Sequence, residues 1–102
     1  MSARSERRFV VRPQAGREIE EAAEWYDNRR SGLGSEFLDA VDTCIASVLQ
    51  SPELHPEVRS GIRRAVLRRF PYNLVYVPRP GEVVVLGCVH GRRNPKIWQN
   101  RA

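Results

Sequence analysis

The sequence predicts an α+β fold in which an N-terminal strand and an antiparallel helical hairpin precede a three-stranded antiparallel meander. Three observations predict it: two stretches repeat apolar residues at helical spacing, three β-type stretches follow them, and the links between neighbouring elements are short. At 102 residues the chain has the length of one domain. We therefore expect a single domain over residues 1–102, with residues 1–8 as a flexible N-terminus.

The first strand is expected over residues 6–12, ERRFVVR. It ends at Pro13, because proline disfavours a helical residue before it and starts helices well. A helix is expected from Ala15, since apolar residues recur three or four positions apart with acidic residues on the other face. The apolar positions are Ala15, Ile19, Ala22, Ala23 and Tyr26.

A second helix is expected after the break RRSGLGS, which holds two glycines and two candidate N-cap residues, Ser31 and Ser35. Its apolar stripe starts at Phe37, recurs at helical spacing through Leu49 and stops before Pro52. Because the connection between the two helices is short, they are expected to pack as an antiparallel hairpin.

Residues 51–61 are rich in turn-forming residues and are expected to form a loop. Strands are expected over Ile62–Phe70, Tyr72–Val77 and Glu82–Val89, and PRPG at residues 78–81 predicts a hairpin turn between the last two. Because the last strand is apolar on both faces, we expect it at the centre of the sheet.

Charge is divided unevenly along the chain. Residues 1–55 hold 7 basic against 10 acidic residues, whereas residues 56–102 hold 10 basic against 2 acidic ones. This distribution favours an anionic partner, nucleic acid or an acidic protein segment, over a role in solubility alone. Alternation in the strand expected over residues 62–70 places Arg63 and Arg69 on one face and Arg64 and Arg68 on the other. So many charges mark an edge strand or an open face.

Several chemistries have little support in the sequence. The two cysteines form no C-x-x-C pair and the two histidines lack the spacing of metal ligands, so we expect no metal and no cofactor. No phosphate loop, G-x-S-x-G or H-E-x-x-H motif is present, and no small-molecule substrate is expected. The longest apolar stretch is far below the roughly 20 residues that span a bilayer. With no apolar signal segment near the N-terminus, we expect a cytoplasmic protein without a membrane partner.

The motif GCVHGRRNPKIW at residues 87–98 holds the candidate functional cluster. His90 can exchange protons near neutral pH, although a histidine at a strand end is also often structural. Arg92 and Arg93 offer fixed charge and paired donors for phosphate or carboxylate groups, or they are solvated surface residues. Trp98 is expected to fold the tail back on the domain.

Four stretches together resemble the RelE/ParE superfamily of toxins from bacterial type II toxin–antitoxin systems: EAAEWYDNRRSGLGSEFLDAVD, SPELHP, IRRAVLRRFPYNLVYV and HGRRNPKIW. The resemblance extends from about Phe9 to about Trp98 and implies the small α+β toxin fold of that superfamily. It also implies a cognate acidic antitoxin that forms a hetero-oligomer with this chain. The antitoxin contacts expected on this basis are Trp25, Phe37, Arg63 and Arg64.

The superfamily has two kinds of target. RelE-like members cut mRNA on the ribosome, whereas ParE-like members, associated with plasmid stabilisation, poison DNA gyrase. Here no tyrosine follows Arg93 and no second histidine accompanies His90, so the acid–base set of a RelE-like tail is not recognisable. The resemblance therefore favours a ParE-like gyrase inhibitor that has no catalytic residues and is neutralised by a ParD-like antitoxin. Its target-binding residues are expected to be Arg68, Arg69, Arg92 and Arg93.

Two alternatives stay open. A RelE-like, ribosome-dependent mRNA interferase would be a ribonuclease that uses His90, Arg68, Arg92 and Arg93 in catalysis. A degenerate member without toxicity would keep the fold only as a binding module.

Overall fold

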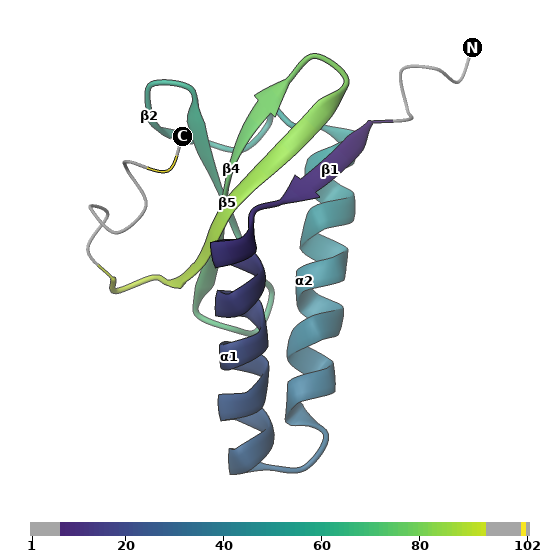
Figure 1. Ribbon diagram of the computed structural model, residues 1–102, viewed down its shortest axis with the longest axis vertical. Helices are drawn as coiled ribbons and strands as arrows, with labels where there is room; N and C mark the ends of the chain where they lie inside the picture. The colour runs from purple at the N-terminus through teal and green to yellow at the C-terminus, as the bar shows by residue number, and fades with distance from the viewer. Residues whose placement is uncertain (1–6, 94–100, 102) are drawn as a thin grey trace.

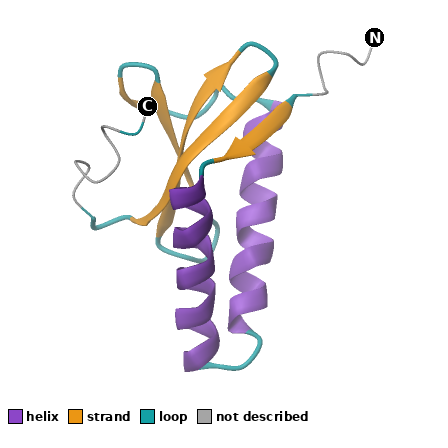
Figure 2. Cartoon of the chain, in the orientation of Figure 1, coloured by secondary structure: helices purple, strands orange, loops and turns teal. Residues whose placement is uncertain are grey.

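The computed structural model describes residues 7–93 and residue 101. Its elements are β1 (Arg8–Val11), α1 (Pro13–Arg29), α2 (Leu33–Gln50), β2 (Glu57–Arg59), β3 (Ile62–Val66), β4 (Tyr72–Arg79) and β5 (Glu82–His90). Figure 1 shows the two helices lying side by side, and Figure 2 separates them from the strands by colour. The predicted α+β class and the order of strand, helical hairpin and meander are confirmed. No helix in the described part of the chain is long and apolar enough to cross a membrane.

The five strands form one sheet in the order β1-β5-β4-β3-β2. β1 pairs with β5 in parallel, and the other neighbours pair antiparallel. The hairpin turn predicted at PRPG lies at Pro80 and Gly81, where Gly81 has a φ of 74° that glycine adopts without strain. β5 lies between β1 and β4 and is buried from Val83 to Val89, which confirms its predicted central position.

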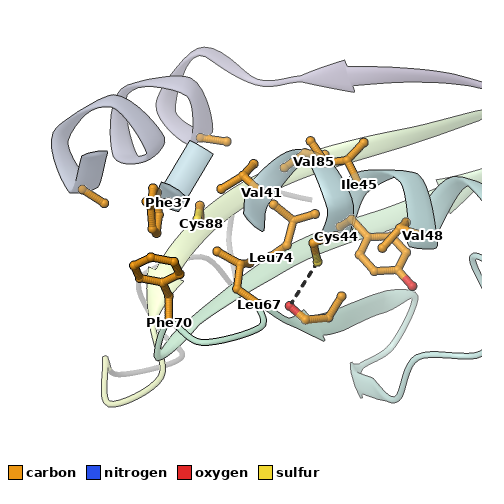
Figure 3. Packing of buried hydrophobic residues seen from close by; sticks show 14 of the residues in the cluster. Phe37, Val41, Cys44, Ile45, Val48, Leu67, Phe70, Leu74, Val85 and Cys88 are labelled. Carbon is orange, nitrogen blue, oxygen red and sulfur yellow. Dashed lines mark hydrogen bonds between the residues drawn. The ribbon is translucent and has the colours of Figure 1, made fainter. Parts of the chain in front are cut away.

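The sheet buries apolar residues on both of its faces, and the helices cover one of them. Figure 3 shows residues of α2, such as Phe37 and Val41, packed against Leu74 of β4. Strand alternation divides β5 between two clusters. Val83 and Val85 join the cluster under the helices, whereas Val84 and Leu86 join a smaller cluster on the other face. This division explains why β5 has no charged residue from Val83 to Val89.

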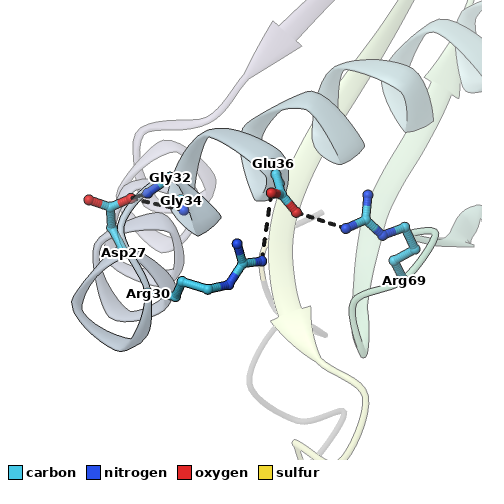
Figure 4. Close-up of polar contacts among 6 residues, drawn as sticks. All are labelled: Asp27, Arg30, Gly32, Gly34, Glu36 and Arg69. Atoms are coloured by element: carbon cyan, nitrogen blue, oxygen red, sulfur yellow. Dashed lines mark hydrogen bonds and ion pairs between the residues drawn. The ribbon is translucent and has the colours of Figure 1, made fainter.

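The turn between α1 and α2 is organised by a side chain of α1. Asp27 Oδ1 accepts hydrogen bonds from the amides of Gly32 and Gly34, at 3.0 and 3.1 Å (Figure 4). A Cβ at Gly34 would lie 2.6 Å from a main-chain oxygen of α1, so glycine is what lets the helices approach this closely. The prediction of Ser31 or Ser35 as the N-cap is wrong: Gly32 occupies that position, and Asp27 supplies the cap.

Two boundaries in the sheet differ from the sequence prediction. Residues 51–61 are not all loop, because Glu57–Arg59 forms β2, which pairs with β3 and makes the edge of the sheet. The strand predicted over Ile62–Phe70 ends at Val66. The chain leaves the strand there, since Arg69 has a φ of 71° and the amide of Leu67 donates to the carbonyl of Tyr72 at 3.0 Å.

Both ends of the chain are described only in part. Of the N-terminus expected to be flexible over residues 1–8, residues 1–6 lie outside the described residues. The last two are part of the fold: Arg8 opens β1, and Arg7 Nη1 donates to the carbonyl of Leu49 at 2.9 Å. Residues 94–100, which include Trp98, also lie outside the described residues.

Candidate functional site

The loop between β3 and β4 and the turn after β5 lie at the same end of the sheet. The amide of Gly91 donates to the carbonyl of Pro71 at 2.8 Å, which ties the two loops together. Of the four arginines predicted to bind the target, two belong to each loop, and all four are exposed. The fold therefore gathers them into one group, which we call the basic end: Arg68, Arg69, Arg92 and Arg93.

One arginine of the basic end is held by an acidic residue. Arg69 Nη2 lies 2.8 Å from Glu36 Oε1 in the first turn of α2, and Arg30 Nη2 lies 3.6 Å from the other oxygen of the same carboxylate (Figure 4). Such exposed pairs add about 0–1 kcal/mol to stability, but they fix where the guanidinium points. Because Arg69 is outside the strand, the prediction that it shares a strand face with Arg63 is wrong.

His90 ends β5 next to the ring of Tyr72, with the ring centroids 5.4 Å apart. Its Nδ1 accepts a hydrogen bond from the amide of Arg92 at 3.1 Å. A main-chain amide can only donate, so the neutral imidazole carries its proton on Nε2. In this tautomer Nε2 is a hydrogen-bond donor.

Burial makes Tyr72 and the two cysteines of the domain poor bases and nucleophiles. Burial raises the pKa of Tyr72; Tyr26 and Cys88 raise it further, and Arg93 lowers it. Burial raises the pKa of Cys44 to about 11, and burial together with Glu18 and Cys44 raises that of Cys88 to about 12. All three groups are therefore protonated near neutral pH. Within residues 7–93 and 101, no group of three or more histidines, cysteines or carboxylates gathers as metal ligands do.

A groove of about 780 Å³ runs between α1 and the C-terminal half of β5. Trp25 lines it from α1 and is 51% exposed, with the guanidinium of Arg29 4.3 Å above its ring. His90 and Arg93 line the groove from the sheet, so the basic end opens into it. The arrangement offers an apolar wall beside fixed positive charge.

The residues predicted to contact an antitoxin do not form one surface. Trp25 is exposed on α1, and Arg64 is exposed on β3. Phe37 is 0% exposed in the core, which corrects its prediction as a surface contact. Arg63 has a structural role within the chain, because its Nη1 donates to two carbonyls of the loop before β2, at 3.2 and 2.7 Å.

Sequence reasoning missed an ion pair on the wall of the groove. Arg101 Nη1 and Nη2 lie 3.1 and 3.0 Å from the two carboxylate oxygens of Glu18. Two signals were available: Glu18 flanks the apolar stripe of its helix, at i+3 from Ala15, and Gly87 interrupts an apolar strand. Glycine inside a strand often marks the close approach of another group.

The fold and the basic end together describe a small α+β domain in which a helical hairpin covers one face of a five-stranded sheet. No protein-family model matches the chain, and no curated protein matches its sequence. Among solved structures, it is similar to a chain of the chromosomal ParDE TA system from P. aeruginosa, with a TM-score of 0.62 and 15% identity. The match covers 84% of this chain and 97% of that chain. At this identity the likeness establishes the fold alone, and it confirms the α+β fold predicted from the sequence.

Proposed function

We propose that the chain is the toxin of a type II toxin–antitoxin system and inhibits growth in the ParE-like manner, by binding DNA gyrase. The observation that carries this proposal is the basic end, where four exposed arginines gather at one end of the sheet. Fixed guanidinium groups bind anionic and polar surfaces but do not transfer protons. The shared fold with a chain of the ParDE TA system supports the same assignment.

The proposed partner in the resting cell is an acidic ParD-like antitoxin. The formal charge of +5 and the exposed Trp25 and Arg64 favour a partner that combines carboxylates with apolar side chains. Binding of such a partner near the groove would cover His90 and Arg93 and would thereby keep the basic end from its target.

A matched pair of double charge reversals tests the basic end. Arg92→Glu/Arg93→Glu changes the basic end, whereas Arg59→Glu/Arg79→Glu makes the same change in net charge at exposed positions at the opposite end of the sheet. We expect the first variant to need at least about tenfold more protein for half-inhibition of gyrase supercoiling, and the second to stay within about threefold of the wild type. Circular dichroism of both variants checks that they are folded.

Equal losses in the two variants would mean that general electrostatic attraction, and not the basic end, binds the target. Undisturbed supercoiling at saturating wild-type protein would rule out gyrase as the target. Growth that continues after induction without an antitoxin would favour the non-toxic binding module.

An mRNA interferase is the second candidate, because His90, Tyr72 and Arg93 lie together where the groove meets the basic end. A proton donor beside a guanidinium can serve a leaving oxygen and a charged phosphorane. If this function is the correct one, transcripts mapped after induction will carry new ends at the positions where ribosomes are bound. His90→Ala will abolish these ends. Intact transcripts during growth arrest would exclude it.

A further inference from the structure

β5 is a central strand for only part of its length. β1 pairs with Glu82–Val85 and ends at Val11, after which the chain turns into α1 at Pro13. Residues 86–90 therefore have β4 on one side and no strand of the described chain on the other. An unpaired strand edge presents amides and carbonyls with which another chain can pair.

Side chains meet the main-chain groups of this free edge. The amide of Cys88 donates to Glu18 Oε1 at 3.0 Å, and the carbonyl of Leu86 accepts from Arg101 Nη1 at 3.1 Å. A carboxylate thus stands where the carbonyl of a neighbouring strand would lie, and a guanidinium stands where its amide would lie. The two side chains thus make the hydrogen bonds that a neighbouring strand would otherwise make.

The site that holds Arg101 depends on the missing side chain of Gly87. A Cβ at this position would lie 2.7 Å from Arg101 Nη1 and 3.2 Å from Glu18 Oε1. The guanidinium and carboxylate groups pair at two points, and their side chains are only 11% and 20% exposed. A two-point pair of this kind is strong and specific for arginine. Arg101 is therefore held by a site shaped for it.

The groove beside this edge suits an extended acidic segment. One wall carries the aromatic rings of Trp25 and Tyr26, and Arg17 and Arg93 line it together with Arg101. Among the described residues, its lining holds these three arginines against two glutamates, Glu18 and Glu21, so its charge favours acidic side chains. The main-chain groups of β5 along the same groove favour a strand, which β-augmentation uses for affinity.

We propose that Arg101 is a latch: in the free protein it closes the edge of β5, and in the complex it gives way to an extended acidic segment of the antitoxin that pairs with residues 86–90. This inference rests on the proposed function. Both closing groups are the ends of flexible side chains, so a strand that pairs with this edge has to displace the side-chain groups of Glu18 and Arg101. Once released, Arg101 adds to the positive charge that the acidic segment meets.

The first experiment tests the latch in the free protein by amide hydrogen exchange. Arg101→Ala is expected to speed exchange of the Cys88 amide by about tenfold or more, because Glu18 loses the partner that positions it. Gly87→Ala, which expels Arg101 by its Cβ, is expected to do the same. The control is Arg8→Ala, which removes an arginine 3.2 Å from Glu82 on the same strand and should leave Cys88 unchanged. Unchanged exchange at Cys88 in Arg101→Ala overturns the latch.

The second experiment uses the proposed acidic antitoxin as the probe, to be sought as the product of a gene adjacent to this one. Its association rate should be about three- to tenfold higher with Arg101→Ala than with Arg8→Ala, and the complex should protect the amides of Cys88 and His90. Binding with equal rates and no new protection at these amides overturns the latch and leaves the proposed function intact. Failure of the wild type to bind this protein overturns the proposed function and the strand pairing. Amide exchange of Cys88 in the free protein still tests whether Arg101 closes the edge of β5.

Discussion

Tyr76 shows at the scale of one residue how burial couples to ionisation. Its side chain is 0% exposed, and its hydroxyl donates to the carbonyl of Pro52 at 2.5 Å. Burial raises its pKa to about 12, against a lowering by Arg63 and smaller increases from Cys44 and Glu53. The folded state therefore favours the protonated hydroxyl. The resulting stability is full below the unfolded pKa of about 10 and is lost as the pH rises through the folded pKa.

Tyr76→Phe is expected to lower the free energy of unfolding at pH 7 by about 1–2 kcal/mol, because the carbonyl of Pro52 loses its donor. Above about pH 10 this deficit should shrink and then reverse, since the wild type must keep a buried hydroxyl protonated and phenylalanine does not titrate. Urea unfolding of both proteins between about pH 7 and pH 11 measures the difference. A deficit that stays constant with pH would contradict the burial of this group.

The helical hairpin depends on Asp27 at the scale of the element. Asp27→Ala is expected to cost about 0.5–2 kcal/mol, because the amides of Gly32 and Gly34 lose their acceptor at the start of α2. Asp27→Asn keeps an acceptor oxygen and should cost less than half as much. Midpoints of urea unfolding compare the two. Equal losses would assign the effect to the charge of Asp27 rather than to the hydrogen bonds.

Periodicity in the sequence was sufficient for the helices and for β5, because each has an apolar pattern set by its own burial. It failed at the end of β3. Leu67 and Phe70 are buried as strand residues would be, yet they lie in a loop that the positive φ of Arg69 turns. β2 has no apolar pattern, since its three residues all fall on the exposed surface and Val58 is its single apolar residue. Its strand conformation comes from pairing with β3. The local sequence pattern of β2 gives no sign of that pairing.

The candidate site shows the same limit at the scale of the whole molecule. The sequence could name the arginines of the basic end, because guanidinium chemistry is local to each residue. It could not show that the 67–71 loop and the 91–93 turn share one end of the sheet. Glu18 and Arg101 lie 83 residues apart, and only the fold brings them to the same strand edge. Phe37 failed as a contact for a related reason: a stripe of apolar residues does not distinguish the core from a docking face.

The distribution of charge over the molecule predicts how its association with an acidic partner depends on salt. The basic end gathers four arginines at one end, and exposed charges are screened beyond about 10 Å at about 0.1 M salt. Between about 50 and 500 mM salt, we expect the association rate with the proposed acidic antitoxin to fall at least about tenfold. The dissociation rate should change much less, because electrostatic steering acts on the encounter.

The placement of these charges matters more than their number. Arg92→Glu/Arg93→Glu should flatten the salt dependence of the association rate, because it removes the local field beside the groove. Arg59→Glu/Arg79→Glu lowers the net charge equally but should keep most of the slope, since those residues lie at the other end of the sheet. Stopped-flow association at several salt concentrations measures both slopes. If the two variants lose the same slope, net charge alone steers the partner, and the basic end has no special role in the encounter.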